Sequence, residues 1–133
     1  MKKTSVLLAD KNTALVESIR DLLETLFDTV VMVSNEESLI ETLDRFDPDI
    51  VVADLVMSVT GAQNVAELLN RYDPELKFIV LSTLEGREVM ESCKSSGASG
   101  YILKRSSAGN LIKAVEAVQD GGTFYSVDSE IPE

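Results

Sequence analysis

Four short apolar runs of this sequence each end in a polar residue, and the types of these residues suit phosphoryl and metal chemistry. The four are Asp10, Asp54, Ser82 and Lys104. Taken alone, an aspartate at the end of a strand is equally well explained as a turn former. Two carboxylates that face a hydroxyl and an ammonium group, however, would bind a hard cation together with a phosphoryl group. This chemistry depends on whether the fold brings the four residues together.

The sequence pattern predicts five strands that alternate with five helices, and these elements would position the four residues. Between the strands, apolar residues recur at the spacing of amphipathic helices. An alternation of this kind predicts an α/β domain with a parallel sheet and helices on both faces. The carboxyl ends of its strands share one edge, so we expect the four polar residues to gather there. The predicted strands are residues 5–9, 29–33, 50–53, 78–81 and 100–103.

Local signals predict how some of the helices begin and end. Ser34 with Glu37 three residues later forms a capping-box pattern, so we expect the second helix to begin at Ser34. Residues 86–96 contain few apolar residues and several serines, which compete with helical hydrogen bonds. They predict a short and comparatively mobile fourth helix. Gly97 is expected to end it in a left-handed conformation.

Composition excludes several functional classes. The chain has no histidine, so no imidazole base is present to activate Ser82 and no imidazole ligand to bind a metal. The segment after the first strand has no glycine, which argues against a dinucleotide or P-loop site. The single cysteine, Cys93, excludes an internal disulfide and suits a reducing compartment. Because no apolar run has the length of a signal peptide or membrane span, we expect a cytoplasmic protein.

Several pieces of the sequence together resemble the receiver domain of two-component response regulators. They are Val-Leu-Leu-Ala-Asp ending at Asp10, Asp-Leu-Val-Met beginning at Asp54, Val-Leu-Ser ending at Ser82, and Gly-Ala-Ser-Gly-Tyr-Ile-Leu-Lys at 97–104. Each is weak alone, but the resemblance covers nearly the whole chain. The last piece, with Gly-Gly at 121–122, is most like receivers that precede a LuxR-type helix-turn-helix domain. The resemblance implies a flavodoxin-like, doubly wound (βα)5 fold with a five-stranded parallel sheet in the order 2-1-3-4-5.

The same resemblance implies a role for each candidate residue. Asp54 would accept a phosphoryl group from a histidine kinase or a phosphotransfer protein in a phosphorelay, so the chain would be a signalling protein and not an enzyme. Mg²⁺ would be bound by Asp10, by Asp54 and by the backbone carbonyl of Val56. The residues that contact the phosphoryl group or switch with it would be Ser82, Thr83, Lys104 and Tyr101.

Lys11 departs from the receiver pattern, which has a second acid at this position. An ammonium group there predicts weak Mg²⁺ binding, unless it turns outward or replaces part of the charge of the metal. Ser58 stands where a proline is common, a smaller change that affects loop rigidity. Two hypotheses stay open: a phosphorylated signalling module, or a degenerate receiver that binds partners without phosphorylation. An aspartate-nucleophile phosphohydrolase is disfavoured, because Val56 stands where that class has its second acid.

The domain and partner predictions follow from the same reasoning. We expect a receiver domain over residues 1–122 and a C-terminal tail, or the start of a linker, over residues 123–133. The net charge of −11, from 12 basic and 23 acidic residues, disfavours direct contact with nucleic acid or an anionic membrane. DNA would then be bound through a further C-terminal domain. The resemblance also implies that the fourth and fifth helices and the fifth strand form the surface for a partner or a homodimer.

Overall fold

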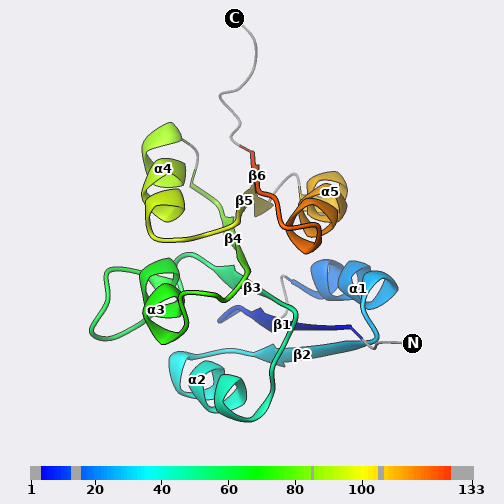
Figure 1. Cartoon of the computed structure of the whole chain (residues 1–133), viewed down its shortest axis with the longest axis horizontal. Helices are drawn as coiled ribbons and strands as arrows, with labels where there is room; N and C mark the ends of the chain where they lie inside the picture. Colours follow the sequence, from blue (N-terminus) through cyan, green and yellow to red (C-terminus); the bar gives the residue numbers. More distant parts are fainter. Residues whose placement is uncertain (1–3, 13–15, 85, 105–106, 127–133) are drawn as a thin grey trace, which may run out of the picture.

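In the part of the chain that this computed structural model describes, residues 4–12, 16–84, 86–104 and 107–126, six parallel strands form one sheet between two layers of helices (Figure 1). The strands follow the order β2-β1-β3-β4-β5-β6. They are β1 (Ser5–Ala9), β2 (Thr29–Val33), β3 (Ile50–Asp54), β4 (Phe78–Ser82), β5 (Gly100–Leu103) and β6 (Phe124–Tyr125). The helices are α1 (Glu17–Leu26), α2 (Glu36–Arg45), α3 (Val65–Tyr72), α4 (Arg87–Ser95) and α5 (Ser107–Gln119).

The core consists of two apolar layers, one on each face of the sheet. Figure 1 shows α1 and α5 on one face and α2, α3 and α4 on the other. Successive strand residues point to opposite layers: Leu7 packs beneath α2 and α3, whereas Val6 and Leu8 pack beneath α1 and α5. All residues of β3 and β4 are buried, which explains why their sequences show no polar alternation. Polar side chains on these strands are therefore restricted to the carboxyl edge.

The structure confirms the predicted strands and the predicted order of the first five. Two strands continue one residue further than expected, because Asp54 pairs with Leu81 and Ser82 pairs with Leu103 in the parallel ladder. Both residues thus belong to the sheet itself and do not merely start a turn. Their backbone positions are fixed by the neighbouring strands.

The sixth strand, β6, was not predicted from the sequence. Its two residues are too few to show a period-two pattern, and main-chain hydrogen bonds define it. The amide of Phe124 donates to the carbonyl of Ser99 over 3.0 Å, and the amide of Ser126 donates to the carbonyl of Tyr101 over 2.8 Å. The predicted tail, residues 123–133, thus includes a strand of the sheet, and residues 127–133 lie outside the described part of the chain.

The helix ends agree with the sequence in one case and differ in another. The capping prediction for Ser34 is wrong: Asn35 is the cap of α2, and its side-chain oxygen accepts from the amide of Ser38 over 2.8 Å. Asparagine caps as well as serine, so the pattern alone could not choose between the neighbours. Gly97 has a φ of +99° and follows α4 as predicted. The short α4 is confirmed, and its mobility stays a prediction.

Gly97→Ala is expected to destabilise the fold by about 1–3 kcal/mol, the usual cost of a non-glycine residue in a strained backbone conformation. An added Cβ would also lie 2.5 Å from the side-chain oxygen of Asn70. Urea denaturation measures the free energy of unfolding. Gly109→Ala is the matched control, because its Cβ would meet nothing within 4 Å and alanine favours a helix. Equal stability of the two variants would contradict the prediction.

Candidate functional site

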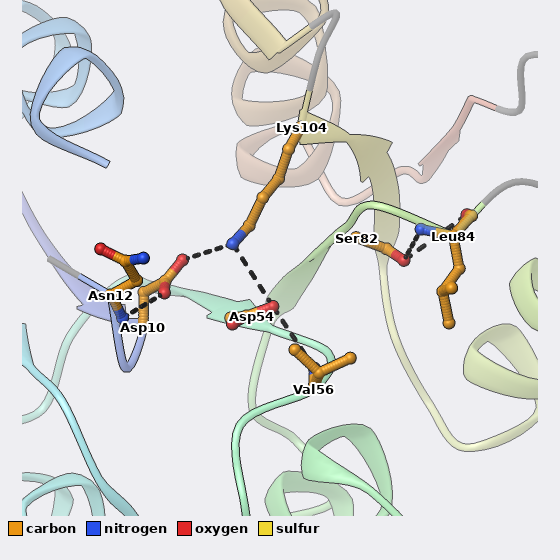
Figure 2. A network of polar contacts seen from close by, with 7 residues as sticks. All are labelled: Asp10, Asn12, Asp54, Val56, Ser82, Leu84 and Lys104. Carbon is orange, nitrogen blue, oxygen red and sulfur yellow. Dashed lines mark hydrogen bonds and ion pairs between the residues drawn. The ribbon is translucent and has the colours of Figure 1, made fainter. Parts of the chain in front are cut away.

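Three of the predicted site residues meet at the carboxyl edge of the sheet (Figure 2). Ala9 of β1 pairs with Ala53 of β3, so the next residues, Asp10 and Asp54, lie side by side. The Nζ atom of Lys104 lies 2.9 Å from Oδ2 of Asp10 and 3.5 Å from Oδ1 of Asp54. Lys104 comes from the end of β5, which is two strands away from β3, and its long side chain spans β4. One ammonium group thus bridges two carboxylates.

This buried cluster holds two carboxylates and only one ammonium group. Asp10 and Asp54 are only 1% and 2% exposed. Burial and the neighbouring charge of Asp10 raise the pKa of Asp54 above its usual value, and the ammonium of Lys104 offsets part of this effect. The amide of Val56 also donates to Oδ1 of Asp54 over 3.3 Å and favours the ionised form. With both acids ionised, one negative charge remains unpaired in the cluster, and a further cation would be attracted to it.

Asp54→Asn is expected to raise the thermal stability of the protein at pH 7. A carboxyl whose pKa is higher in the folded state than in the unfolded state destabilises the fold above that pKa, and the penalty fades as pH falls. The variant leaves Lys104 paired with Asp10 alone. We expect a gain of several degrees in Tm, given about 3–5 °C per kcal/mol for a domain of this size.

Thermal unfolding from pH 7 down to pH 4 measures this effect. The gain of Asp54→Asn over the wild type should shrink as the pH falls. Asp21→Asn is the control, because Asp21 is exposed and its ion pair with Arg20 lies on the surface. A variant Asp54→Asn that is less stable than the wild type at pH 7 would show that Asp54 is fully compensated by Lys104.

The oxygen atoms of the two aspartates fit a hard cation. Oδ1 of Asp10 accepts from the amide of Asn12 over 2.8 Å, whereas Oδ2 is buried without a hydrogen bond and contacts the ammonium of Lys104. Among the described residues, no cluster of three or more acidic, cysteine or histidine side chains could hold a metal. Mg²⁺ is commonly held by one or two carboxylates and completes its shell with water. The donor set therefore fits Mg²⁺ with few protein ligands.

Ser82 lies at the same edge but is directed away from Asp54. Its hydroxyl oxygen accepts from the amide of Leu84 over 2.8 Å, and Figure 2 shows it turned toward Leu84. The hydroxyl of Tyr101 donates to the carbonyl of Leu84 over 2.7 Å. Burial raises the pKa of Tyr101, so its phenol keeps the proton that it donates. Thr83 is exposed. Of the predicted phosphoryl-contacting and switch residues, Ser82 and Tyr101 thus share a second network through Leu84, whereas Lys104 contacts the carboxylates.

Sequence reasoning missed Leu84, which joins Ser82 to Tyr101 through its main-chain atoms. A serine hydroxyl that accepts from the amide two residues later is a common turn, and this was the available signal. Lys11 is exposed, and in the described residues it forms no ion pair with Asp10 or Asp54. Of the alternatives for Lys11, the structure shows the outward orientation. The ammonium group between the carboxylates belongs to Lys104.

The family model of the response regulator receiver domain matches residues 6–116. The chain belongs to this family. Receiver domains generally bind Mg²⁺ at their phosphorylation site and interact with histidine kinases, and the donor set described above fits the metal.

Curated relatives agree with this assignment. The transcriptional regulatory protein DegU of Brevibacillus brevis is 30% identical over 124 residues, which cover 92% of this receiver domain and 52% of DegU. The transcriptional regulatory protein MctR of Rhizobium johnstonii is 30% identical over 127 residues, with 93% and 59% covered. The chain thus spans about half the length of the curated relatives it matches. These similarities are those expected of a receiver that precedes an output domain.

Solved structures share the fold. The RcsB response regulator of Salmonella typhimurium has a TM-score of 0.85 and 25% identity, and the match covers 97% of this chain and 65% of RcsB. The isolated receiver domain of RcsB from Salmonella enterica, in the presence of the phosphomimetic BeF3-, has a TM-score of 0.81 and 23% identity, with 94% of each chain covered. The α/β, flavodoxin-like receiver fold is therefore established.

Proposed function

We propose that Asp54 accepts a phosphoryl group from a histidine kinase or phosphotransfer protein. The observation that supports this is the buried Asp54 carboxylate at the end of β3, 3.5 Å from the ammonium of Lys104. A carboxylate oxygen would attack the phosphorus atom of a phosphohistidine. The phosphorus–nitrogen bond then breaks, its electron pair stays on the imidazole, and the imidazole nitrogen takes up a proton. Lys104 can follow the new charge and pair with the phosphoryl oxygens of the acyl phosphate.

Mg²⁺ belongs to this proposal. Asp10 and Asp54 would hold it through their carboxylates, and Val56 would contribute its backbone carbonyl. When bound, the ion offsets the negative charge that develops on the phosphoryl oxygens during transfer. The Oδ2 atom of Asp10 is buried without a hydrogen bond and already contacts one cation, the ammonium of Lys104, which supports this assignment. Lys104 must then give up part of its contact with Asp10 and turn toward the phosphoryl group.

Ser82 and Tyr101 are proposed to carry the response. A phosphoryl group on Asp54 would offer the Ser82 hydroxyl a charged acceptor, which is stronger than the carbonyl of Leu84, to which this hydroxyl now donates over 3.5 Å. The turn after β4 would then rearrange, and Tyr101 would lose or change its bond to the carbonyl of Leu84. Thr83, exposed beside Ser82, could contact the phosphoryl group through its amide or hydroxyl. These steps would alter the surface formed by α4, β5 and α5.

The output is proposed to lie in a further domain of a longer protein. Homodimerisation through α4, β5 and α5 would present two such domains to DNA, while the net charge of −11 disfavours direct contact of the receiver itself with nucleic acid. A solved structure of RcsB, a relative at 24% identity, contains two RcsB dimers bound to two parallel DNAs. Transcription regulation by this chain is thus proposed by analogy with its relatives.

The remaining alternatives receive less support. Lys11 is the feature that favours a degenerate receiver, but Lys11 is exposed, and the ammonium that contacts the carboxylates is that of Lys104. We propose a signalling module and not an enzyme, since the described site offers an acceptor without a base for turnover.

A cytoplasmic location is part of the proposal, in keeping with the buried free thiol of Cys93. No described helix combines the length and apolar character needed to cross a bilayer.

Site mapping tests the assignment of Asp54. The chain is incubated with acetyl phosphate and Mg²⁺ and treated with borohydride, which reduces an acyl phosphate to an alcohol. Peptide mass spectrometry should then find homoserine in place of Asp54 and unchanged aspartate at Asp10. Homoserine at any other aspartate, or at none, would overturn the assignment.

A further inference from the structure

The chain at β6 is hydrogen-bonded to the network of Ser82, Leu84 and Tyr101, and this contact is separate from the carboxylate site. The amide of Ser126 donates to the carbonyl of Tyr101 over 2.8 Å, while the hydroxyl of the same tyrosine donates to Leu84 over 2.7 Å. Leu84 in turn donates its amide to the hydroxyl oxygen of Ser82 over 2.8 Å. Three hydrogen bonds therefore form an unbroken path from the end of β4 to the residue that follows β6.

Tyr125 gives β6 a second attachment, to the end of α4. Its hydroxyl donates to the carbonyl of Ala98 over 2.6 Å, and Nζ of Lys94 lies 5.2 Å from the centre of its ring. Ala98 is buried just beyond α4, and its amide donates to the carbonyl of Cys93 over 3.0 Å. A movement of α4 would therefore change the contacts of the ring and the hydroxyl of Tyr125.

The other side of β6 is attached to α5. Phe124 packs against the apolar layer beneath α1 and α5, whereas Tyr125 packs against the layer beneath α4. The side-chain amide of Asn110 donates to the hydroxyl oxygen of Ser126 over 3.2 Å, and Ser126 is 8% exposed. Figure 1 shows β6 beside β5, between α4 and α5. This two-residue strand thus contacts both helices that flank β5.

We propose that β6 is a readout strand: a change of hydrogen bonding at Ser82 reaches β6 and Ser126 through Leu84, Tyr101 and the contact of Tyr125 with the end of α4. The inference rests on the proposed function, because it takes phosphorylation of Asp54 as the event that changes Ser82. It adds a route by which the receiver loosens or tightens the attachment of β6 to the sheet. A strand of two residues opens easily, so small changes in its contacts shift its population of open states.

Coupling of this kind is reciprocal, so it can be tested from both ends. The measured quantity is the hydrogen-exchange rate of two backbone amides by NMR, Ser126 in the readout strand and Leu84 beside the site. From the strand end, Tyr125→Phe removes one hydroxyl and keeps the ring over Lys94. Tyr72→Phe is the matched control, because Tyr72 at the end of α3 loses a hydroxyl bond to Asp44 of α2, and both helices lie away from β6 in Figure 1.

Tyr125→Phe is expected to raise exchange at Ser126 about fivefold, the size of effect that one neutral hydrogen bond has on local opening. Exchange at Leu84 should rise by at least about twofold, whereas Tyr72→Phe should leave both amides unchanged. An unchanged Leu84 in Tyr125→Phe would overturn the proposal, since the two ends would then be independent.

From the site end, beryllofluoride with Mg²⁺ serves as the phosphoryl probe, with Asp54→Asn as its control. In the wild type it should shift the Leu84 amide and change exchange at Ser126 by at least about threefold. If Leu84 responds and Ser126 does not, the readout strand is refuted while the proposed function stands. If neither amide responds, the proposed phosphoryl site fails, and the Tyr125→Phe measurement decides on the strand by itself.

Discussion

Lys104→Met should lose about 2–3 kcal/mol of folding free energy at pH 7. Removing one member of a buried ion pair typically costs about 3–5 kcal/mol, because the partner charge stays buried and unpaired. Here two carboxylates lose their shared ammonium, and the 19% exposure of the Lys104 side chain reduces the cost somewhat. Urea denaturation at pH 7 measures the loss.

The pH dependence identifies the cause of that loss. The ammonium of Lys104 lowers the pKa of Asp54, so this pKa must rise further in the variant. A raised carboxyl pKa lowers stability above that pKa, and protonation removes the penalty. The gap between wild type and Lys104→Met should therefore narrow as the pH falls toward 4. Lys113→Met, an exposed lysine of α5, is the control and should change stability by less than about 0.5 kcal/mol.

Addition of Mg²⁺ provides a second check on the same variant. With the ammonium gone, both carboxylates are free for a cation, and a ligand that binds only the folded state stabilises it. We therefore expect Mg²⁺ to raise the Tm of Lys104→Met more than that of the wild type. A loss of stability that responds neither to acid nor to Mg²⁺ would mean that Lys104 acts by packing alone.

Lys11→Asp should lower the Kd for Mg²⁺ about tenfold, which corresponds to about 1.4 kcal/mol. The affinity of oxygen sites for divalent cations increases with the number of ligand charges, and this substitution adds a carboxylate next to Asp10. The structure shows Lys11 exposed, so the gain comes chiefly from the new carboxylate and less from relief of repulsion. Phosphorylation of Asp54 by acetyl phosphate should also become faster.

Calorimetric titration with Mg²⁺ measures this effect, and two variants separate its causes. Lys11→Gln removes the positive charge without adding a ligand, and we expect it to bind Mg²⁺ nearly as the wild type does. Lys113→Asp makes the same change of net charge on the distant, exposed face of α5. If Lys11→Asp and the wild type bind Mg²⁺ equally well, position 11 lies outside the metal site and its substitution has no functional meaning.

The carboxylate cluster was predictable because the fold rule behind it is simple. In a parallel sheet, the carboxyl ends of the strands meet at one edge, so Asp10, Asp54 and Lys104 could be placed together from strand patterns alone. The apolar runs before them are buried on both faces and show little ambiguity. The fold class followed from the same patterns, whereas the predicted strand order was implied by the family resemblance.

The features that were not predictable depend on main-chain contacts. β6 forms because the amides of Phe124 and Ser126 donate to the carbonyls of residues 99 and 101. The side chains of a two-residue strand do not indicate these main-chain bonds. The direction of the Ser82 hydroxyl depends on the amide of Leu84. The sequence left several alternatives open for Lys11, which is exposed in the structure. Asparagine and serine are equally good caps, so the sequence could not show that Asn35 and not Ser34 caps α2.

The most direct test of the central claim is the intact mass of the protein after incubation with acetyl phosphate and Mg²⁺. Phosphorylation at one aspartate predicts a single added phosphoryl group in the wild type and none in Asp54→Ala. The ammonium of Lys104 lies closer to Asp10 than to Asp54, 2.9 Å against 3.5 Å, so we expect that Asp10 does not replace Asp54 as the acceptor. A wild type that gains no phosphoryl group, or an adduct that persists in Asp54→Ala, would contradict the assignment of this chain as a receiver phosphorylated on Asp54.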